Sequence, residues 1–307
     1  MATIPNVRLS LPSRPENVLL VRQALRGLAD TVALDPVELN DISTALSEAC
    51  NNVVAHAYPD GPGPMDVQMQ GSAEGLEVLV RDHGCGLKPH ASEPSEIGGI
   101  GIPVMLALAD SVEFAGTDGK GTDVRMRFST PKTASLAGEG PRQEDAEEIL
   151  AEGNGGRDGV YLAVGPPQLA SEVLSRVLAA VAARAHLSTE RIATTRPLAE
   201  RLVDHFAGGA DGAGHLALAA TVSPRQLDLR VVPVPAGPSL GELPSGLEEL
   251  TECQRVSRSG SVEVLALRLQ DRRPGGESGG ESGSVPQEGK KNSDMPGDHG
   301  ESHRHTA

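Results

Sequence analysis

Apolar residues follow two different periods along residues 6–128. The segment VRLSL alternates apolar and polar positions, which is typical of a half-buried strand. Residues 17–34 and 35–58 instead repeat apolar positions every three or four residues, which predicts two amphipathic helices. Asp35 and Pro36 are residue types favoured at an N-cap and at the first helical position, so the second helix is expected to begin there.

After the second helix, the pattern changes to short strands. Residues 65–82 predict two strands around a Glu-Gly turn. A Gly-rich segment, a helix over 103–110, and paired strands over 111–117 and 122–128 are expected to follow. Two helices followed by a short antiparallel sheet predict a two-layer α/β sandwich of the α+β class.

Composition divides the rest of the chain. Residues 131–157 are rich in Gly, Glu, Asp and Ser and are expected to form a linker, with one helical turn at EEILAE. Apolar periodicity returns over 158–270, whereas residues 271–307 show no period and predict a disordered tail. We therefore expect a first ordered domain at residues 6–130 and a second at 158–270.

The net charge of −15 argues against direct nucleic-acid binding, which calls for a basic patch or stripe. The three cysteines, Cys50, Cys85 and Cys253, are widely spaced and odd in number. This spacing predicts neither a disulfide framework nor a metal site, but a reducing, cytoplasmic compartment. No apolar run approaches the length of a membrane span, so no membrane segment is expected.

Four short features carry candidate chemistry, and they occur in a fixed order. Glu48 and Asn52 are four residues apart and share one helix face. Asp82 then ends an apolar strand in the motif DHGCG. GGIG, at residues 98–101, leads into a helix, and GKGT, at 119–122, leads into the last strand. Each feature alone is a weak signal, but the four together in this order are strong.

Each feature has a physical use in nucleotide binding. An aspartate at a strand end can accept a hydrogen bond from the exocyclic amine of adenine, and the glycines beside it allow the base to approach the backbone. A Gly-rich turn that opens a helix presents N–H groups to phosphate oxygens. The carboxamide oxygen of Asn52 suits Mg²⁺, and Glu48 could deprotonate an attacking hydroxyl.

The chain resembles the GHKL ATPases with the Bergerat nucleotide-binding fold, and among them the anti-sigma-factor serine kinases of the RsbW and SpoIIAB type. The resemblance rests on SEACNNVVAHAY, VRDHGCGL, GGIGIPVMLALADSVEF and GKGTDVRMRF, and it covers roughly residues 6–130. It implies the following roles: Glu48 as catalytic base; Asn52 as Mg²⁺ ligand; Asp82, with Gly84 and Gly86, as the reader of adenine; Gly98, Gly99 and Gly101 as the phosphate-binding lid; and Thr122 as a hydroxyl near adenine. Asn51 is expected only at the rim, and His56 and Tyr58 in packing or capping.

The second ordered domain is predicted to be a degenerate repeat of the first. LEVLVRDHGCG has its counterpart in LDLRVVPVPAG at residues 227–237, and the predicted elements follow the same order. Asp82 then aligns with Pro233, which has no acceptor side chain. Asn52 aligns with Arg201 or Leu202, and Glu48 with Pro197 or Leu198. We therefore expect a tandem duplication in which the second, degenerate domain binds no ATP.

By resemblance, the chain is expected to be an ATP- and Mg²⁺-dependent serine/threonine protein kinase and anti-sigma factor. Its expected partners are a sigma factor and an anti-sigma antagonist, which it would phosphorylate. It is expected to work as an intrachain pseudo-dimer or as a homodimer. Two alternatives stay open: a non-catalytic, nucleotide-gated switch, and an ATPase or sensor kinase of another GHKL branch.

Overall fold

The computed structural model describes residues 6–86, 100–116, 120–136, 150, 159–207, 215–234, 239–260 and 262–271. The predicted disordered tail lies outside the described residues from residue 272 onward, and so does most of the predicted linker.

The first half of the chain forms the predicted helices and strands in the predicted order, together with two short helical turns that were not predicted. They are β1 (Val7–Pro12), α1 (Pro15–Val32), α2 (Pro36–Asn52), the π-helical turn η1 (Val53–Ala57), β2 (Pro64–Gly71), β3 (Leu76–Asp82), α3 (Gly101–Leu108), β4 (Ser111–Gly116), β5 (Thr122–Phe128) and the 3-10 helix η2 (Pro131–Leu136).

The second half repeats the alternation of helices and strands. Its elements are β6 (Val160–Val164), α5 (Pro167–Arg184), α6 (Thr189–Ala193), α7 (Thr195–Ala207), β7 (His215–Ser223), β8 (Gln226–Val234), α8 (Leu247–Leu250), β9 (Cys253–Ser259) and β10 (Val262–Gln270).

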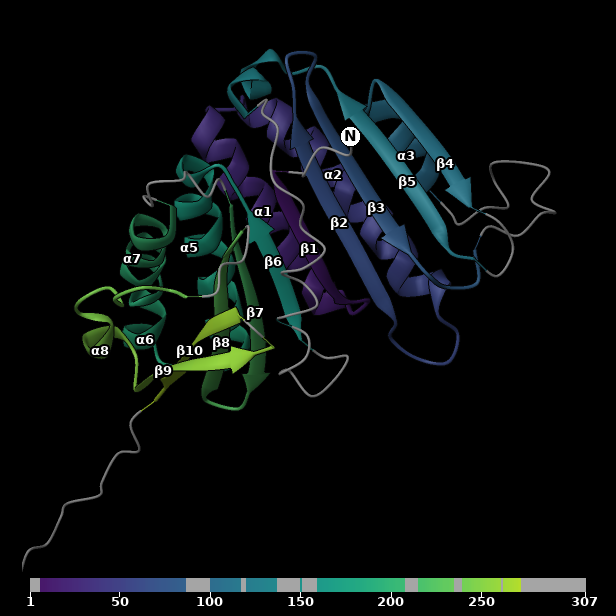
Figure 1. Cartoon of the computed structure of the whole chain (residues 1–307). Coiled ribbons are helices and arrows are strands. Elements are labelled where there is room, and N and C mark those ends of the chain that lie inside the picture. Colours follow the sequence, from purple (N-terminus) through teal and green to yellow (C-terminus); the bar gives the residue numbers. More distant parts are fainter. Residues whose placement is uncertain are drawn as a thin grey trace, which may run out of the picture. The chain divides into compact units, whose positions relative to one another are not determined.

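All the described strands join one antiparallel sheet (Figure 1). The sheet has ten strands in the order β4-β5-β3-β2-β1-β6-β7-β8-β10-β9. The first and second halves meet at its centre, where β1 pairs antiparallel with β6 and Leu9 lies opposite Leu162. The backbone hydrogen bonds of β1 are therefore shared between β2 on one side and β6 on the other.

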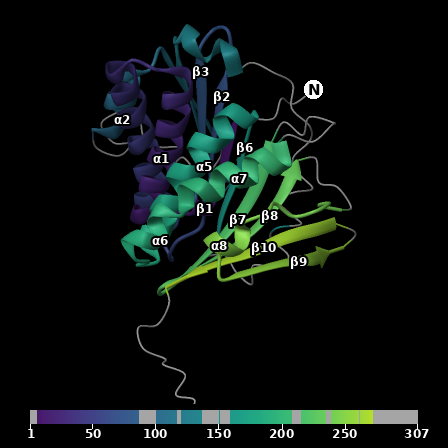
Figure 2. The same ribbon diagram turned by 90° about the vertical axis from the view of Figure 1, so that its left-hand side faces the viewer.

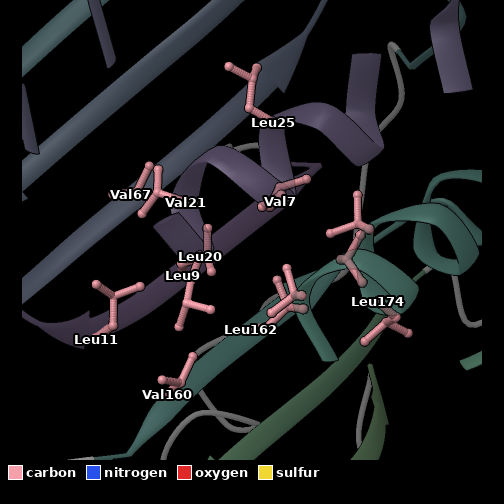
Figure 3. Packing of buried hydrophobic residues seen from close by; sticks show 14 of the residues in the cluster. Val7, Leu9, Leu11, Leu20, Val21, Leu25, Val67, Val160, Leu162 and Leu174 are labelled. Carbon is pink, nitrogen blue, oxygen red and sulfur yellow. The ribbon is translucent and has the colours of Figure 1, made fainter. Parts of the chain in front are cut away.

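The helices α1, α2, α5 and α7 cover one face of this sheet, which confirms the predicted two-layer sandwich (Figure 2). At the centre of the sheet, Val7 and Leu9 of β1 and Leu162 of β6 are fully buried beneath α1 and α5 (Figure 3). Burying a side chain of this size stabilises the fold by about 1.5–3 kcal/mol. The core is thus continuous from one half to the other.

Helix α2 begins where the sequence predicts. Asp35 is the N-cap, with its side chain accepting a hydrogen bond from the Val37 N–H at 2.8 Å, and Glu38 completes a capping box by accepting from the Asp35 N–H at 3.1 Å. A capping box satisfies two otherwise orphan N–H groups, so the start of the helix is fixed. The predicted single helix over 35–58 ends differently, because Val53–Ala57 widens into a π-helical turn.

The two halves differ on the sheet face that lies away from the helices. In the first half this face carries ion pairs, such as Arg125–Glu77 at 2.5 Å and Arg81–Asp123 at 2.6 Å. In the second half this face also carries an ion pair, Arg268–Asp228 at 2.6 Å, but it has an apolar patch where Leu150 is fully buried with Tyr161 and Val232. Leu150 comes from the EEILAE segment, so this residue of the predicted linker packs against the sheet.

Pro197 lies in the first turn of α7, directly after the break between α6 and α7. A proline is tolerated in the first turn of a helix, and without an N–H it cannot bond the carbonyl of Ala193, the last residue of α6. Within the described part of the chain, no helix combines the length and apolar character that crossing a membrane requires.

Candidate active site

The first group of predicted site residues gathers where α2 meets α3. Gly101, the first residue of α3, is buried against the polar face of α2. A Cβ added at Gly101 would lie 2.9 Å from Glu48 Oε2 and 3.4 Å from Asn52 Oδ1. Glycine therefore lets the start of α3 approach the carboxylate and the carboxamide without displacing the end of the Glu48 side chain.

The second group lies in the loop after β3. The Asp82 side chain is 5% exposed, and its Oδ1 accepts a hydrogen bond from the Gly84 N–H at 2.8 Å. A Cβ on Gly84 would overlap the carbonyl oxygen of Ala57, which also accepts from the Cys85 N–H at 2.9 Å. The loop is therefore fixed against η1, and Gly84 is required by close backbone approach.

Thr122 lies beside Asp82 in the sheet. Arg81 of β3 pairs with Asp123 of β5, so Asp82 and Thr122 are the next residues along these two strands. Gly121 contacts the Asp82 backbone so closely that a Cβ there would overlap the Asp82 carbonyl. The structure thus brings together Asp82, Gly84 and Thr122, as the sequence predicts.

A single continuous element connects the two groups. α2 carries Glu48 and Asn52, and the η1 turn that continues it holds the loop of Asp82 and Gly84 through Ala57. The π-helical turn lies between Asn52 and Ala57, and so between the two groups. Such turns are rare and are frequent at functional sites, and no signal in the sequence marks this one.

Tyr58 has a structural role that sequence reasoning described only as packing or capping. Its hydroxyl accepts a hydrogen bond from the His83 N–H at 2.8 Å and donates one to the Pro64 carbonyl at 2.5 Å. Burial raises the pKa of Tyr58, so the hydroxyl keeps the proton that it donates at neutral pH. Tyr58 therefore holds the residue after Asp82 to the start of β2.

The other predicted residues have the following positions. Gly86 has a φ of 71°, a left-handed conformation that favours glycine. Gly98 and Gly99 lie outside the described residues, so their predicted role in the lid stays a prediction. Asn51 is exposed, as expected of a residue at the rim. Cys50 is buried in the core, and burial raises the pKa of its thiol to about 12.

These residues fit Mg²⁺ and a nucleotide. Asn52 Oδ1 and Glu48 Oε2 are oxygen donors, the ligand type that Mg²⁺ prefers, and both lie against the N-terminus of α3. Helix N-termini favour phosphate groups, because their N–H groups lack helical partners. Asp82 is the last residue of β3, before the loop that η1 holds. Its nearly buried carboxylate can accept a hydrogen bond from an amine.

A comparison with protein families matches residues 11–128 to the histidine kinase-like ATPase domain. Serine-protein kinase RsbW of Bacillus pumilus is 32% identical over 133 residues, which are 38% of this chain and 82% of that protein. RsbW of Bacillus velezensis is 30% identical over 131 residues, with the same coverage of each chain. RsbW of Bacillus subtilis is 31% identical over 127 residues, which cover 37% of this chain and 79% of that protein.

Among solved structures, the histidine kinase domain of a blue-light activated histidine kinase from Erythrobacter litoralis aligns with 33% of this chain and 49% of that one. Its identity is 24% and its TM-score 0.25. The RsbW matches cover most of each relative and fall on the half that carries Glu48, Asn52 and Asp82. The chain therefore belongs to the histidine kinase-like (GHKL) ATPase family, in the branch of the RsbW serine-protein kinases.

Proposed function

We propose that the first half of the chain is an ATP-dependent serine/threonine protein kinase and anti-sigma factor. The observation that carries the proposal is the close approach of Gly101 to Glu48 and Asn52. It places a carboxylate, a carboxamide oxygen and a helix N-terminus around one point, which is what phosphoryl transfer requires. The relatives described above are named serine-protein kinases, which supports the same function.

Each residue has a role in this proposal. The Asp82 carboxylate accepts a hydrogen bond from the exocyclic amine of adenine, while its Oδ1 holds Gly84 in place. The α3 N-terminus faces the phosphate groups, and Asn52 holds Mg²⁺, which when bound neutralises charge on the phosphate oxygens. Glu48 accepts the proton of the serine or threonine hydroxyl of the acceptor protein.

Phosphate transfer replaces one bond to the γ-phosphorus with another. The acceptor oxygen forms a bond to the γ-phosphorus, the bond between that phosphorus and the β–γ bridging oxygen breaks, and ADP leaves. The hydroxyl proton passes to Glu48. The new phosphate adds negative charge and acceptor oxygens to the partner protein, which alters its contact with the kinase. We propose that the acceptor is an anti-sigma antagonist and that the protein it competes with is a sigma factor.

A screen for phosphate transfer tests this function. The full chain is incubated with Mg²⁺ and γ-labelled ATP, together with antagonist-like proteins encoded by the same genome. We expect label on a serine or threonine of one of them. Binding of ATP without transfer to any protein would contradict the kinase and favour a nucleotide-gated switch. Label on a histidine of the chain itself, or hydrolysis alone, would place it with another GHKL branch.

A further inference from the structure

The two halves are related by strand order about the centre of the sheet. Outward from the β1–β6 pair, the first half runs β1-β2-β3-β5-β4 and the second runs β6-β7-β8-β10-β9. The helices that cover this centre, α1 and α5, have 18 residues each and begin with proline. An arrangement in which two like units meet through the same elements is that of a twofold dimer.

Strand register fixes which residues correspond. Asp82 of β3 lies opposite Met65, the second residue of β2, and Pro233 of β8 lies opposite Leu216, the second residue of β7. Pro233 therefore occupies in the second half the sheet position that Asp82 occupies in the first. Proline offers neither a side-chain acceptor nor a backbone N–H, so an adenine amine finds no partner there.

A second correspondence lies at the helix that follows. Gly101 opens α3 against Glu48 and Asn52 of α2, whereas Gly246 is the N-cap of α8 and lies against Arg201 of α7. A Cβ on Gly246 would overlap the Arg201 guanidinium. The second half therefore has a permanent cation where the first half has a carboxylate and a carboxamide.

The Arg201 side chain also bridges two elements. Its guanidinium donates a hydrogen bond to the carbonyl oxygen of Ser245, the residue before Gly246. A guanidinium stays charged at all physiological pH values and cannot ligate a metal ion. It repels Mg²⁺, and its hydrogen bond to Ser245 ties α7 to the turn before α8, at the place that corresponds to the contact of Gly101 with Glu48 and Asn52.

We propose that the second half is a nucleotide-free copy of the fold, permanently closed by Arg201, that takes the place of a second subunit. The chain then carries one nucleotide site within a pair of fused domains. The part of the proposal that concerns α7 and α8 does not depend on the proposed kinase function. Only the identity of the ligand at the first site rests on it.

The first test counts nucleotide sites in the full chain. Isothermal titration with Mg²⁺ and a non-hydrolysable ATP analogue is expected to give one site per chain. Hydrogen exchange with the same analogue is expected to slow in α2 and in the loop after β3, with no change over Ser239–Leu250. Two sites per chain, or protection over Ser239–Leu250, would overturn the proposal. If no analogue binds at all, the proposed function fails, and the Arg201 variant below decides the inference.

The second test removes the arginine. Arg201→Ala is expected to speed hydrogen exchange over Ser239–Leu250 at least tenfold and to leave the affinity of the first site unchanged. Arg196→Ala is the matched control, because Arg196 is an exposed arginine of the same helix that pairs with Glu172 and Glu200. The control is expected to leave exchange in that segment as in the parent chain. Equal exchange in the Arg201→Ala variant and its parent would show that Arg201 does not close the site.

Discussion

The Asp82 carboxylate shapes its own loop, in addition to its proposed role in binding adenine. One oxygen accepts from the Gly84 N–H, and the side chain is 5% exposed at the end of β3. The sequence motif DHGCG predicted this residue as a reader of adenine but did not show that it also shapes its own loop. The neighbouring carboxylate Asp123 lies on the exposed face and is bound by Arg81, whose hydrogen bonds lower the pKa of Asp123.

Asp82→Asn is expected to weaken ATP binding about 10- to 100-fold. A hydrogen bond to a charged group contributes about 1.5–3 kcal/mol, and an uncharged amide both loses that charge and presents donors to an amine. The measurement is the dissociation constant of an ATP analogue by calorimetry. Asp123→Asn serves as the control and is expected to change this constant less than about twofold, as surface substitutions usually do.

An unchanged affinity in Asp82→Asn would show that adenine binds elsewhere. A loss of similar size in Asp123→Asn would show that the effect comes from general changes at this edge of the sheet and not from the adenine contact.

At the scale of elements, helix starts and strands could be predicted, because local chemistry sets them. Asp35 and Pro36 mark the start of α2, and the alternation in TDVRMRF gives β5 at its observed limits. The π-helical turn after Asn52 could not be predicted, because it depends on the loop of Gly84 and Cys85 that packs on Ala57. Periodicity has no access to such contacts between distant segments.

The apolar patch on the outer face of the second half was not predicted, although the sequence contains a signal for it. β6 reads VYLAV, a continuous apolar run, which is typical of a strand buried on both faces. Periodicity predicts order in this region but does not identify the segment that covers the second face of the strand. Leu150 lies against that face, from a segment whose composition predicts a linker.

The packing of α1 on α5 depends on one glycine. A Cβ on Gly27 would lie 2.6 Å from the Cα of Val173, closer than real Cβ atoms come. Gly27→Ala is therefore expected to destabilise the protein by about 1–3 kcal/mol through overpacking, although alanine favours a helix by about 1 kcal/mol over glycine. The measurement is the free energy of unfolding in urea.

Arg26→Ala is the matched control, since Arg26 is exposed on the same helix. It is expected to change stability by less than about 0.5 kcal/mol. A Gly27→Ala variant more stable than its parent would contradict the close approach of the two helices.

At the scale of the whole molecule, the chain unites two halves in one sheet and one core. The strand order supports the proposed tandem copy, because Asp82 and Pro233 lie at corresponding positions of the two halves of the sheet. Alignment left Asn52 between Arg201 and Leu202. The contact of Arg201 with Gly246 favours the first choice, because Gly101 meets Asn52 in the same way.

Because β1 pairs with β6 and α1 packs on α5, the surfaces through which a second copy would add to β1 are already used. We therefore expect the chain to have the mass of one chain in multi-angle light scattering, with or without ATP. A dimer that persists on dilution would contradict the view that the second half replaces a second subunit.

The most direct test of the account is a single-turnover comparison of the parent chain with Glu48→Gln, using Mg²⁺, γ-labelled ATP and the acceptor protein found in the screen. Glutamine keeps the shape of the side chain but cannot accept the hydroxyl proton. We predict ATP binding within about twofold of the parent and phosphate transfer slowed at least about 100-fold, as expected for loss of a general base. Transfer at the parent rate would show that Glu48 is not the base and that the proposed chemistry of this site is wrong.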